Sequence, residues 1–462
     1  MTQTLRLTAL LAAAVLPLSC TMGPDYQQPL TAVPESLPGP SGEHSIADRA
    51  WADVFTDPVL RSLIAEALEN NRDLAIAAHR IEEARAITGV AASEFFPNLG
   101  ASGSAERTRR ARSITPPGTD REVNEFRLGG LLSYEVDLWG RVRRSNEASR
   151  AALLASQFGR ATIETTIIAA VASAYIDLRA LDRQLQIASQ TVESRRRSLD
   201  LVKERAAQGV TSELEVGQAE VLLHQAEVSI PRIQNQLATT SNALSTLLGR
   251  LPGDIPRGRS LEALDEGIAV TGGLPSNLLL RRPDILGAEQ DLVALNADIG
   301  IARTAYFPSL SLTGRGGMAS TDLDRLLRSD NITLAGAADL AAPIFTAGRI
   351  SSSIRATEAR RDQALARYES VILTAFRESA DALATHGHAN EIVRRQQQLV
   401  DSLDKVARLA TSRYEGGASS FLEVLDAERN AFEGQLALTD ARRLKLQSVV
   451  AAYRALGGGW AR

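Results

Sequence analysis

The sequence predicts a mixed α/β membrane protein in which strands from several chains share one β-barrel and very long helices continue from it as a coiled-coil tube. Three observations lead to this fold class. The chain of 462 residues repeats its own motifs, each half contains strand-like alternation, and each half ends in an exceptionally long helical pattern. Few aromatic residues (4%) and abundant Ala, Leu and Arg suit long helices.

The internal repeat is visible as motifs that recur at a nearly constant spacing. SEFFPNL (93–99) returns as TAYFPSL (304–310), 211 residues later. QGVTSELEVGQAE (208–220) returns as GGASSFLEVLDAE (416–428), 208 residues later. A loop between these motifs can absorb the slip of three residues. The protein is therefore predicted to be a duplication.

Each half is expected to begin with a helical segment and to continue with two strands. The helical segments are predicted at 59–95 and 276–306. The strand-like runs at 124–139 and 331–345 alternate between apolar and polar residues, which is typical of strands with one apolar face. Each of these runs has a weaker partner just before it in the sequence, so four strands per chain are expected.

A helical hairpin completes each half. The first helix is predicted at about 140–208 and 348–416, and a turn containing Gly leads into a second helix at about 211–248 and 419–456. At 1.5 Å per residue, the first helix of each hairpin extends for roughly 100 Å. Apolar residues in the second hairpin follow steps of four, three and three, which predicts a coiled-coil seam at Leu399, Leu403, Val406 and Leu409.

Four amphipathic strands are too few to close a barrel, because the smallest outer-membrane barrels have about eight. An open sheet edge cannot face lipid, since its backbone groups would be unpaired. If these strands cross a membrane, several chains must therefore share one barrel. The alternative that the residues leave open is an ordinary soluble sheet packed on the helices.

The first residues are expected to be a leader. An apolar run follows Arg6, which predicts a signal peptide over 1–19. Cys20, the only cysteine, stands where a bacterial lipoprotein carries its lipid, so 20–58 is expected to be a lipid-anchored extended segment. Pro17 occupies the position three residues before the cysteine, which is usually Leu. Thr21 follows, in place of the Asp that marks inner-membrane retention, and this favours the outer membrane.

Several classes of function are disfavoured by the sequence. The net charge of −4 offers no cationic surface for nucleic acid, so no nucleic-acid partner is expected. A single cysteine excludes a disulfide within the chain and a cysteine-based metal cluster. No H-E-x-x-H, G-x-S-x-G or P-loop pattern occurs, and the paired histidines His386 and His388 do not share a helix face. We therefore expect no enzyme activity, no catalytic residue, no metal and no cofactor.

One long stretch resembles a known family. LRRPDILGAEQDLVALNADIGIARTAYFPSLSLTG (280–314) is similar to the signature of the TolC-like outer-membrane efflux proteins, and CTMGPDYQQP and WADVFTDPVLRSLIAEALENNRDL (51–74) are similar to their lipoprotein branch. The resemblance covers nearly the whole chain. It implies a homotrimer with a twelve-stranded barrel, four strands per chain, in the outer membrane of a Gram-negative cell. A helical tunnel would then cross the periplasm to a periplasmic adaptor and an inner-membrane RND-type pump.

The resemblance also implies a gate where the hairpins turn, at 208–216 and 416–426. It places an acidic constriction at Glu423 and Asp426, whose spacing puts both on one helix face. Three chains would bring six carboxylates around one axis and favour cations.

The same resemblance assigns a latch to Tyr414 and its acidic partner Glu215. Some members of the family add an arginine where this chain has Ser419, so one latch is absent or is rebuilt around Arg413.

The sequence leaves alternative functions open. The chain is predicted to be a passive exit duct for solutes, with repeat 1 at 59–255 and repeat 2 at 256–462. It could instead be the outer-membrane component of a type I protein secretion system, or a periplasmic adaptor or coiled-coil scaffold. The sequence does not indicate the substrate or the cognate pump.

Overall fold

The computed structural model describes residues 21–30, 34, 45–264, 270–271 and 275–460. The predicted signal peptide and Cys20 lie outside these residues. The described part divides into two compact units. Unit 1 comprises the described residues of Met1–Leu30, Ile81–Ser156 and Ala288–Tyr368, and unit 2 comprises those of Thr31–Arg80, Gln157–Gly287 and Glu369–Arg462. Each unit therefore takes residues from both halves of the sequence.

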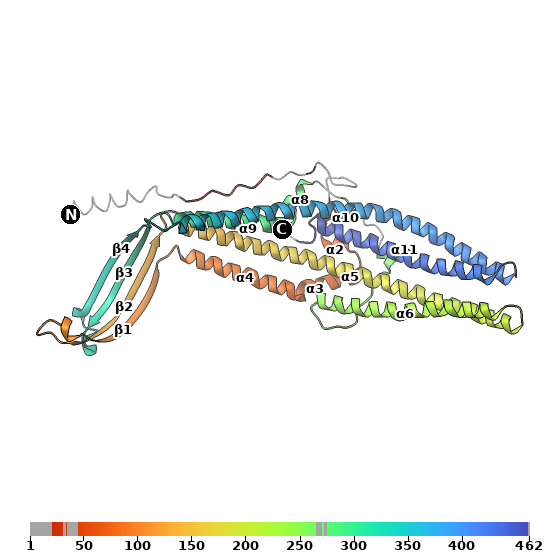
Figure 1. Cartoon of the computed structure of the whole chain (residues 1–462), viewed down its shortest axis with the longest axis horizontal. Helices are drawn as coiled ribbons and strands as arrows, with labels where there is room; N and C mark the ends of the chain where they lie inside the picture. Colours follow the sequence, from red (N-terminus) through yellow and green to blue (C-terminus); the bar gives the residue numbers. More distant parts are fainter. Residues whose placement is uncertain (1–20, 31–33, 35–44, 265–269, 272–274, 461–462) are drawn as a thin grey trace. The chain divides into compact units, whose positions relative to one another are not determined.

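Unit 1 contains a four-stranded antiparallel sheet in the order β1-β2-β3-β4 (Figure 1). The strands are β1 (Asn98–Arg109), β2 (Glu122–Val136), β3 (Ser309–Ser320) and β4 (Ile332–Ala341). Within the described chain, β1 and β4 each pair on one side only, so the sheet is open at both edges. Its register aligns Leu99, Leu132 and Gly314 across three strands. The two strands that the sequence indicated weakly, β1 and β3, are complete strands of 12 residues each.

One face of this sheet is apolar and the other is polar. Alternation along the strands places one set of side chains on each face, and the register joins these sets into continuous bands. The apolar band includes Leu99, Ala101, Ala105, Phe126, Leu128, Leu132, Tyr134, Leu310, Leu312, Met318, Leu334 and Leu340. The opposite face carries Ser102, Ser104, Arg127, Ser133, Ser311, Thr313 and Asp339.

The helices repeat along the chain with equal lengths. The 22-residue helix before each strand pair is α4 (Arg72–Ser93) or α9 (Pro283–Thr304). The 67-residue helix is α5 (Arg141–Ala207) or α10 (Arg349–Glu415), and the 35-residue helix is α6 (Glu213–Leu247) or α11 (Phe421–Ala455). The shorter elements are η1 (Ile46–Asp48), α2 (Trp51–Val54), η2 (Arg112–Ile114), α7 (Leu261–Leu264), η3 (Leu323–Arg325) and η4 (Ser329–Asn331).

The helical segments expected at 59–95 and 276–306 each consist of two helices. α3 (Pro58–Asn70) is separated from α4 by Asn71, and α8 (Ser276–Arg281) is separated from α9 by Arg282. The Asn71 side chain accepts hydrogen bonds from the N–H groups of residues 73 and 74 and so caps α4. Arg282 precedes a proline, which disfavours helical backbone. The predicted cap at the start of α3 is present, since Asp57 accepts from Val59 N–H at 2.7 Å.

Unit 2 has a hydrophobic core in which α5 contributes fully buried side chains such as Ile168, Val171 and Tyr175. The Tyr175 hydroxyl accepts from Gly258 N–H at 2.8 Å. α5 is the one helix of the described residues that is long and apolar enough to cross a membrane by composition, with 44% of its apolar window buried. Part of that apolar stretch is buried in this core.

The face by which α10 packs on α11 overlaps the predicted coiled-coil seam only in part. Leu399 and Val406 are 49% and 52% exposed, whereas Val400 is 5% exposed and Ala410 is also buried. Within unit 2, Val400 and Leu403 lie beside Gly434 of α11, and Ala410 belongs to the apolar cluster near the turns. Of the apolar stripe read from the sequence, Leu399, Val406 and Leu409 are exposed in the single chain.

The segment after Cys20 is held against unit 1 as an extended strap. Met22 N–H donates to Trp139 O at 3.0 Å. The Arg144 side chain, which is almost fully buried, donates to the Asp25 carboxylate at 2.7 Å. The Tyr26 hydroxyl donates to Glu289 at 3.1 Å. The strap therefore lies against both the junction of β2 with α5 and helix α9.

Candidate functional site

Both hairpin turns are built in the same way. α5 ends at Ala207 and α10 ends at Glu415, and each is followed by a glycine with positive φ, +74° at Gly209 and +73° at Gly417. Residues with a Cβ rarely adopt this conformation, so glycine is the natural residue to end these helices. Each turn is then closed by a backbone hydrogen bond that spans six residues. Val210 N–H donates to Arg205 O in the first turn, and Ala418 N–H donates to Arg413 O in the second.

The two latch residues predicted from the sequence are in contact. Tyr414, near the end of α10, is 7% exposed, and its hydroxyl donates to Glu215 Oε2 of α6 at 3.2 Å. The Thr211 hydroxyl donates to the same carboxylate oxygen. The Tyr414 ring packs on Phe421, with ring centroids 5.1 Å apart. The hydrogen bond thus joins the second hairpin to the first, whereas the ring contact between Tyr414 and Phe421 lies within the second hairpin.

Arg205 is a further link between the hairpins that the sequence reasoning missed. Its guanidinium donates to Tyr414 O at 3.1 Å and to Glu415 O at 2.9 Å, and it lies 4.8 Å from the centre of the Tyr414 ring. These carbonyls end α10 and have no partner within the helix, so a cation there is favourable. From the sequence, Arg205 is recognisable as a basic residue in the last turn of α5. Such residues commonly interact with the end of their own helix, so its contact with α10 could not be predicted.

Arg413 does not join the two hairpins, in contrast to the rebuilt latch that the sequence suggested around it. Its guanidinium donates to Ala418 O in its own turn at 3.3 Å. Ser419 occupies the position where an arginine was considered, and its buried hydroxyl has no hydrogen-bond partner among the described residues.

The predicted acidic pair lies on the exposed face of the first turns of α11. Glu423 and Asp426 are both exposed in the single chain. Asp426 accepts from Arg429 at 2.6 Å and from Asn430 at 3.2 Å. Arg429, which the acidic spacing does not indicate, supplies a counter-charge one helical turn away. An exposed pair of this kind contributes little to stability, but it reduces the net negative charge near Asp426.

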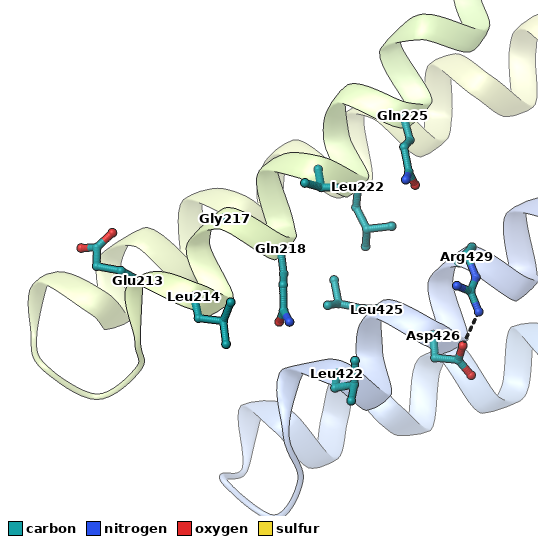
Figure 2. Close-up of a pocket in the computed structure, with 11 residues that line it drawn as sticks. Glu213, Leu214, Gly217, Gln218, Leu222, Gln225, Leu422, Leu425, Asp426 and Arg429 are labelled. Atoms are coloured by element: carbon teal, nitrogen blue, oxygen red, sulfur yellow. Dashed lines mark hydrogen bonds and ion pairs between the residues drawn. The ribbon is translucent and has the colours of Figure 1, made fainter.

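A groove of about 520 Å³ lies between α6 and α11 beside the turns (Figure 2). Figure 2 shows Leu214 of α6 and Leu422 and Leu425 of α11 along an apolar floor. Gln218 lies between the two helices, and the Asp426–Arg429 pair stands on the α11 side. The acidic face is therefore continuous with an apolar groove.

A second polar layer lies farther from the turns. Arg195 of α5 is 3% exposed, donates to Leu222 O at 2.6 Å, and lies 5.3 Å from the centre of the Phe432 ring. Burial lowers the pKa of Arg195 and raises the pKa of the neighbouring Glu428, which accepts from Ser198 at 3.4 Å. Charged side chains that are taken out of water in this way destabilise an interface unless their partners stay in place.

The arrangement is a largely apolar contact between the two hairpins. Apolar side chains from all four helices form a cluster around Tyr414 and Phe421, with Val202, Val216, Leu222, Val424 and Leu425 among its members. The described residues contain no group of three or more His, Cys, Asp or Glu side chains placed to hold a metal ion. Such a site can hold two hairpins together or release them.

The family model described as outer membrane efflux protein matches the chain twice, at residues 63–250 and 274–458. The toluene efflux pump outer membrane protein TtgI of Pseudomonas putida is 38% identical over 450 residues, which is 96% of each chain. The cation efflux system protein CusC of Escherichia coli is 34% identical over 447 residues, again 96% of each chain.

Solved structures of such channels have the same fold as this chain. A crystal structure of CusC gives a TM-score of 0.88 over 95% of this chain and 100% of its own, at 34% identity. The open state of the MtrE outer membrane channel of Neisseria gonorrhoeae gives 0.87 over 95% and 98%, at 31% identity. The TolC-like architecture of barrel strands and helical tunnel is thereby shown for this chain.

Proposed function

Because this chain belongs to the outer membrane efflux protein family, and is thus the outer-membrane channel of a tripartite efflux system, we propose that its two hairpin turns form the gate of a homotrimeric duct. The family consists of transport channels, and its description names no catalytic activity. The single observation that carries the proposal is the set of contacts from Tyr414 to Glu215 and Arg205, which joins the two hairpins.

The open sheet supports a trimer. Unpaired strand edges in lipid are costly, so β1 and β4 need partners from other chains. Three chains with four strands each give a barrel of twelve. The exposed apolar stripe that includes Leu399 and Val406 supplies a further surface for a neighbouring chain. The two repeats, 59–255 and 256–462, then supply one hairpin each to every third of the tunnel.

The tunnel's partners are a periplasmic adaptor and an inner-membrane transporter of the RND type. The adaptor would open the gate by separating the hairpins, and solutes would then leave by diffusion. The names of the relatives refer to toluene for TtgI and to a cation for CusC. The shared scaffold with such different cargoes supports a permissive duct whose substrate is selected by the pump.

Glu423 and Asp426 are proposed to line the constriction of the closed gate. Their exposure on one face of α11 supports this placement. Arg429 neutralises part of the charge that Asp426 contributes, so the preference for cations should be modest and should depend mainly on Glu423.

Cys20 is proposed to carry the lipid that anchors the mature protein to the outer membrane. The strap supports this role, because Thr21 lies against Gly140 and Met22 is hydrogen-bonded to Trp139, close to the sheet. Mass spectrometry of the mature N-terminus should find an acyl adduct on Cys20. Cys20→Ser should slow maturation or mislocalise the protein, and an unmodified wild-type cysteine would contradict the proposal.

Conductance in planar bilayers tests the gate. Tyr414→Phe combined with Glu215→Ala removes the hydrogen bond between the hairpins and should raise single-channel conductance. Arg413→Gln is a matched control, because among the described residues Arg413 donates to Ala418 O in its own turn and not to the other hairpin. Unchanged conductance in the double variant, or an equal rise in the control, would refute the assignment.

A further inference from the structure

The end of the β1–β2 hairpin that lies away from the helices is unusually basic. Between residues 106 and 122 it carries five arginines and three acidic residues. The arginines are Arg107, Arg109, Arg110, Arg112 and Arg121. The loop between β3 and β4 differs, since residues 321–331 contain three aspartates and two arginines. The excess of positive charge is therefore confined to the β1–β2 hairpin and is not shared by the β3–β4 hairpin.

Two of these arginines belong to the apolar face of the sheet. Alternation along β1 puts Arg107 and Arg109 on the same face as Leu99, Ala101 and Ala105. This is the face that meets lipid in a barrel with a wet lumen. A charged side chain on a lipid-facing strand is costly in the middle of the bilayer and much less costly at its surface.

Strand length places both arginines at the membrane surface. The helix-proximal end of the sheet carries aromatic side chains, including the stacked Trp139 and Phe307 with ring centroids 4.7 Å apart, which is typical of a membrane interface. A tilted strand crosses the hydrocarbon core in about ten residues. Counted from the nearby Leu99–Leu132 pair, that length ends close to the Thr108–Val123 pair. Arg107 and Arg109 flank this level.

The two guanidinium groups share one carboxylate and remain accessible. Glu122 lies 2.6 Å from Arg107 and 3.6 Å from Arg109. The two arginine side chains are 70% and 69% exposed. One acidic group cannot neutralise two cations, and most of the donor N–H groups stay free to bind another anion. Planar guanidinium groups match phosphate oxygens in a bidentate manner.

We propose that Arg107 and Arg109 bind the phosphate groups of the glycolipid that forms the outer leaflet of the outer membrane. The helical tunnel leaves the other end of the strands and is periplasmic, so this hairpin end faces outward. The acyl chains of such a lipid would lie against Leu99, Ala101 and Ala105, directly below the arginines. This inference rests on the outer-membrane location and is independent of the gate, so its failure would leave the channel function untouched.

The test is a titration of the full-length protein, purified in nanodiscs, with fluorescent diphosphoryl lipid A. Arg107→Gln combined with Arg109→Gln should weaken binding roughly 25-fold, about fivefold for each arginine near a charged surface. Arg127→Gln is the matched control. It removes an arginine of the same sheet from the polar face, where Arg127 is already paired with Glu125, and it should leave binding unchanged.

Two further ligands separate a lipid site from a site for free anions. Monophosphoryl lipid A should bind more weakly than the diphosphoryl form, and inorganic phosphate should not displace the lipid at millimolar concentrations, because it makes no contact with the apolar strand face. Wild-type binding by the double variant, an equal loss in Arg127→Gln, or displacement by inorganic phosphate would each overturn the proposal.

Discussion

The two hairpin turns have the same backbone and use it differently. α5 and α10 start 208 residues apart, as do α6 and α11, so each position of one turn has a counterpart in the other. Arg205 corresponds to Arg413, yet Arg205 binds carbonyls of the other hairpin and Arg413 binds one of its own.

The acidic residues diverge in the same way. Glu215 corresponds to Glu423, but Glu215 accepts the Tyr414 hydroxyl whereas Glu423 is exposed. Tyr414 itself corresponds to Ala206. The two turns thus have equivalent backbones but different side chains. The second hairpin supplies the aromatic side chain, and the first supplies its polar partners. The proposed gate depends on that asymmetry.

The largest difference between the turns should follow from removing the tyrosine. Tyr414→Ala deletes a buried ring that packs on Phe421 and under Arg205, and should destabilise the contact between the hairpins by about 3–4 kcal/mol. Hydrogen exchange at the amides of the two turns measures this loss. Ala206→Gly, at the counterpart position, should cost only about 1 kcal/mol. Equal losses would show that the turns are equivalent.

The arginine pair should give the next largest difference. Arg205→Gln removes two charge-assisted hydrogen bonds to α10 and should cost about 2 kcal/mol in the same exchange experiment. Arg413→Gln removes one bond within its own turn and should cost less than about 1 kcal/mol. The reverse order would contradict the assignment of Arg205 as the link between the hairpins.

Glu428 should make the contact between the hairpins sensitive to pH. Burial raises its pKa, so folding favours the protonated carboxyl. The stabilising contribution of Glu428 should therefore be largest below the ordinary Glu pKa of 4.5 and should fall as the pH rises from there through its raised pKa. Thermal unfolding measured across this range should show the fall, and Glu428→Gln should remove it.

The counterpart of Glu428 provides the control. Glu220 pairs with Lys203 at 3.0 Å on the other hairpin. Glu220→Gln leaves Glu428 in place and should keep the pH dependence, so its disappearance in that variant would assign the effect to the wrong hairpin.

The smallest effect is expected at the acidic constriction. Asp426→Asn should lower the cation-to-anion permeability ratio by less than about fivefold, because Arg429 already offsets this exposed carboxylate. Arg429→Gln should shift the ratio the other way. Reversal potentials in a salt gradient measure both. If Asp426→Asn raised the permeability ratio and Arg429→Gln lowered it, Asp426 would not line the pore.

The sequence predicted the features that depend on periodicity and repetition. The hairpins, the four strands and the pairing of Tyr414 with Glu215 follow from apolar spacing and family resemblance, and the structure contains all three. The sequence did not predict which side chains contact one another between segments that are distant in the sequence. Arg205 reaches the other hairpin, and Val400 instead of Leu399 packs beside α11. Helical periodicity identifies apolar faces but not which face each neighbour covers.

The most direct test of a gate held between unlike turns is a double-mutant cycle on Tyr414→Phe and Glu215→Ala, read as the free energy of opening from single-channel recordings. The structure predicts a coupling of about 1 kcal/mol, because the two groups share one hydrogen bond. Each single variant should then open the channel nearly as much as the double variant does. Additive effects of the two substitutions would contradict the account, since they would mean that Tyr414 and Glu215 act separately.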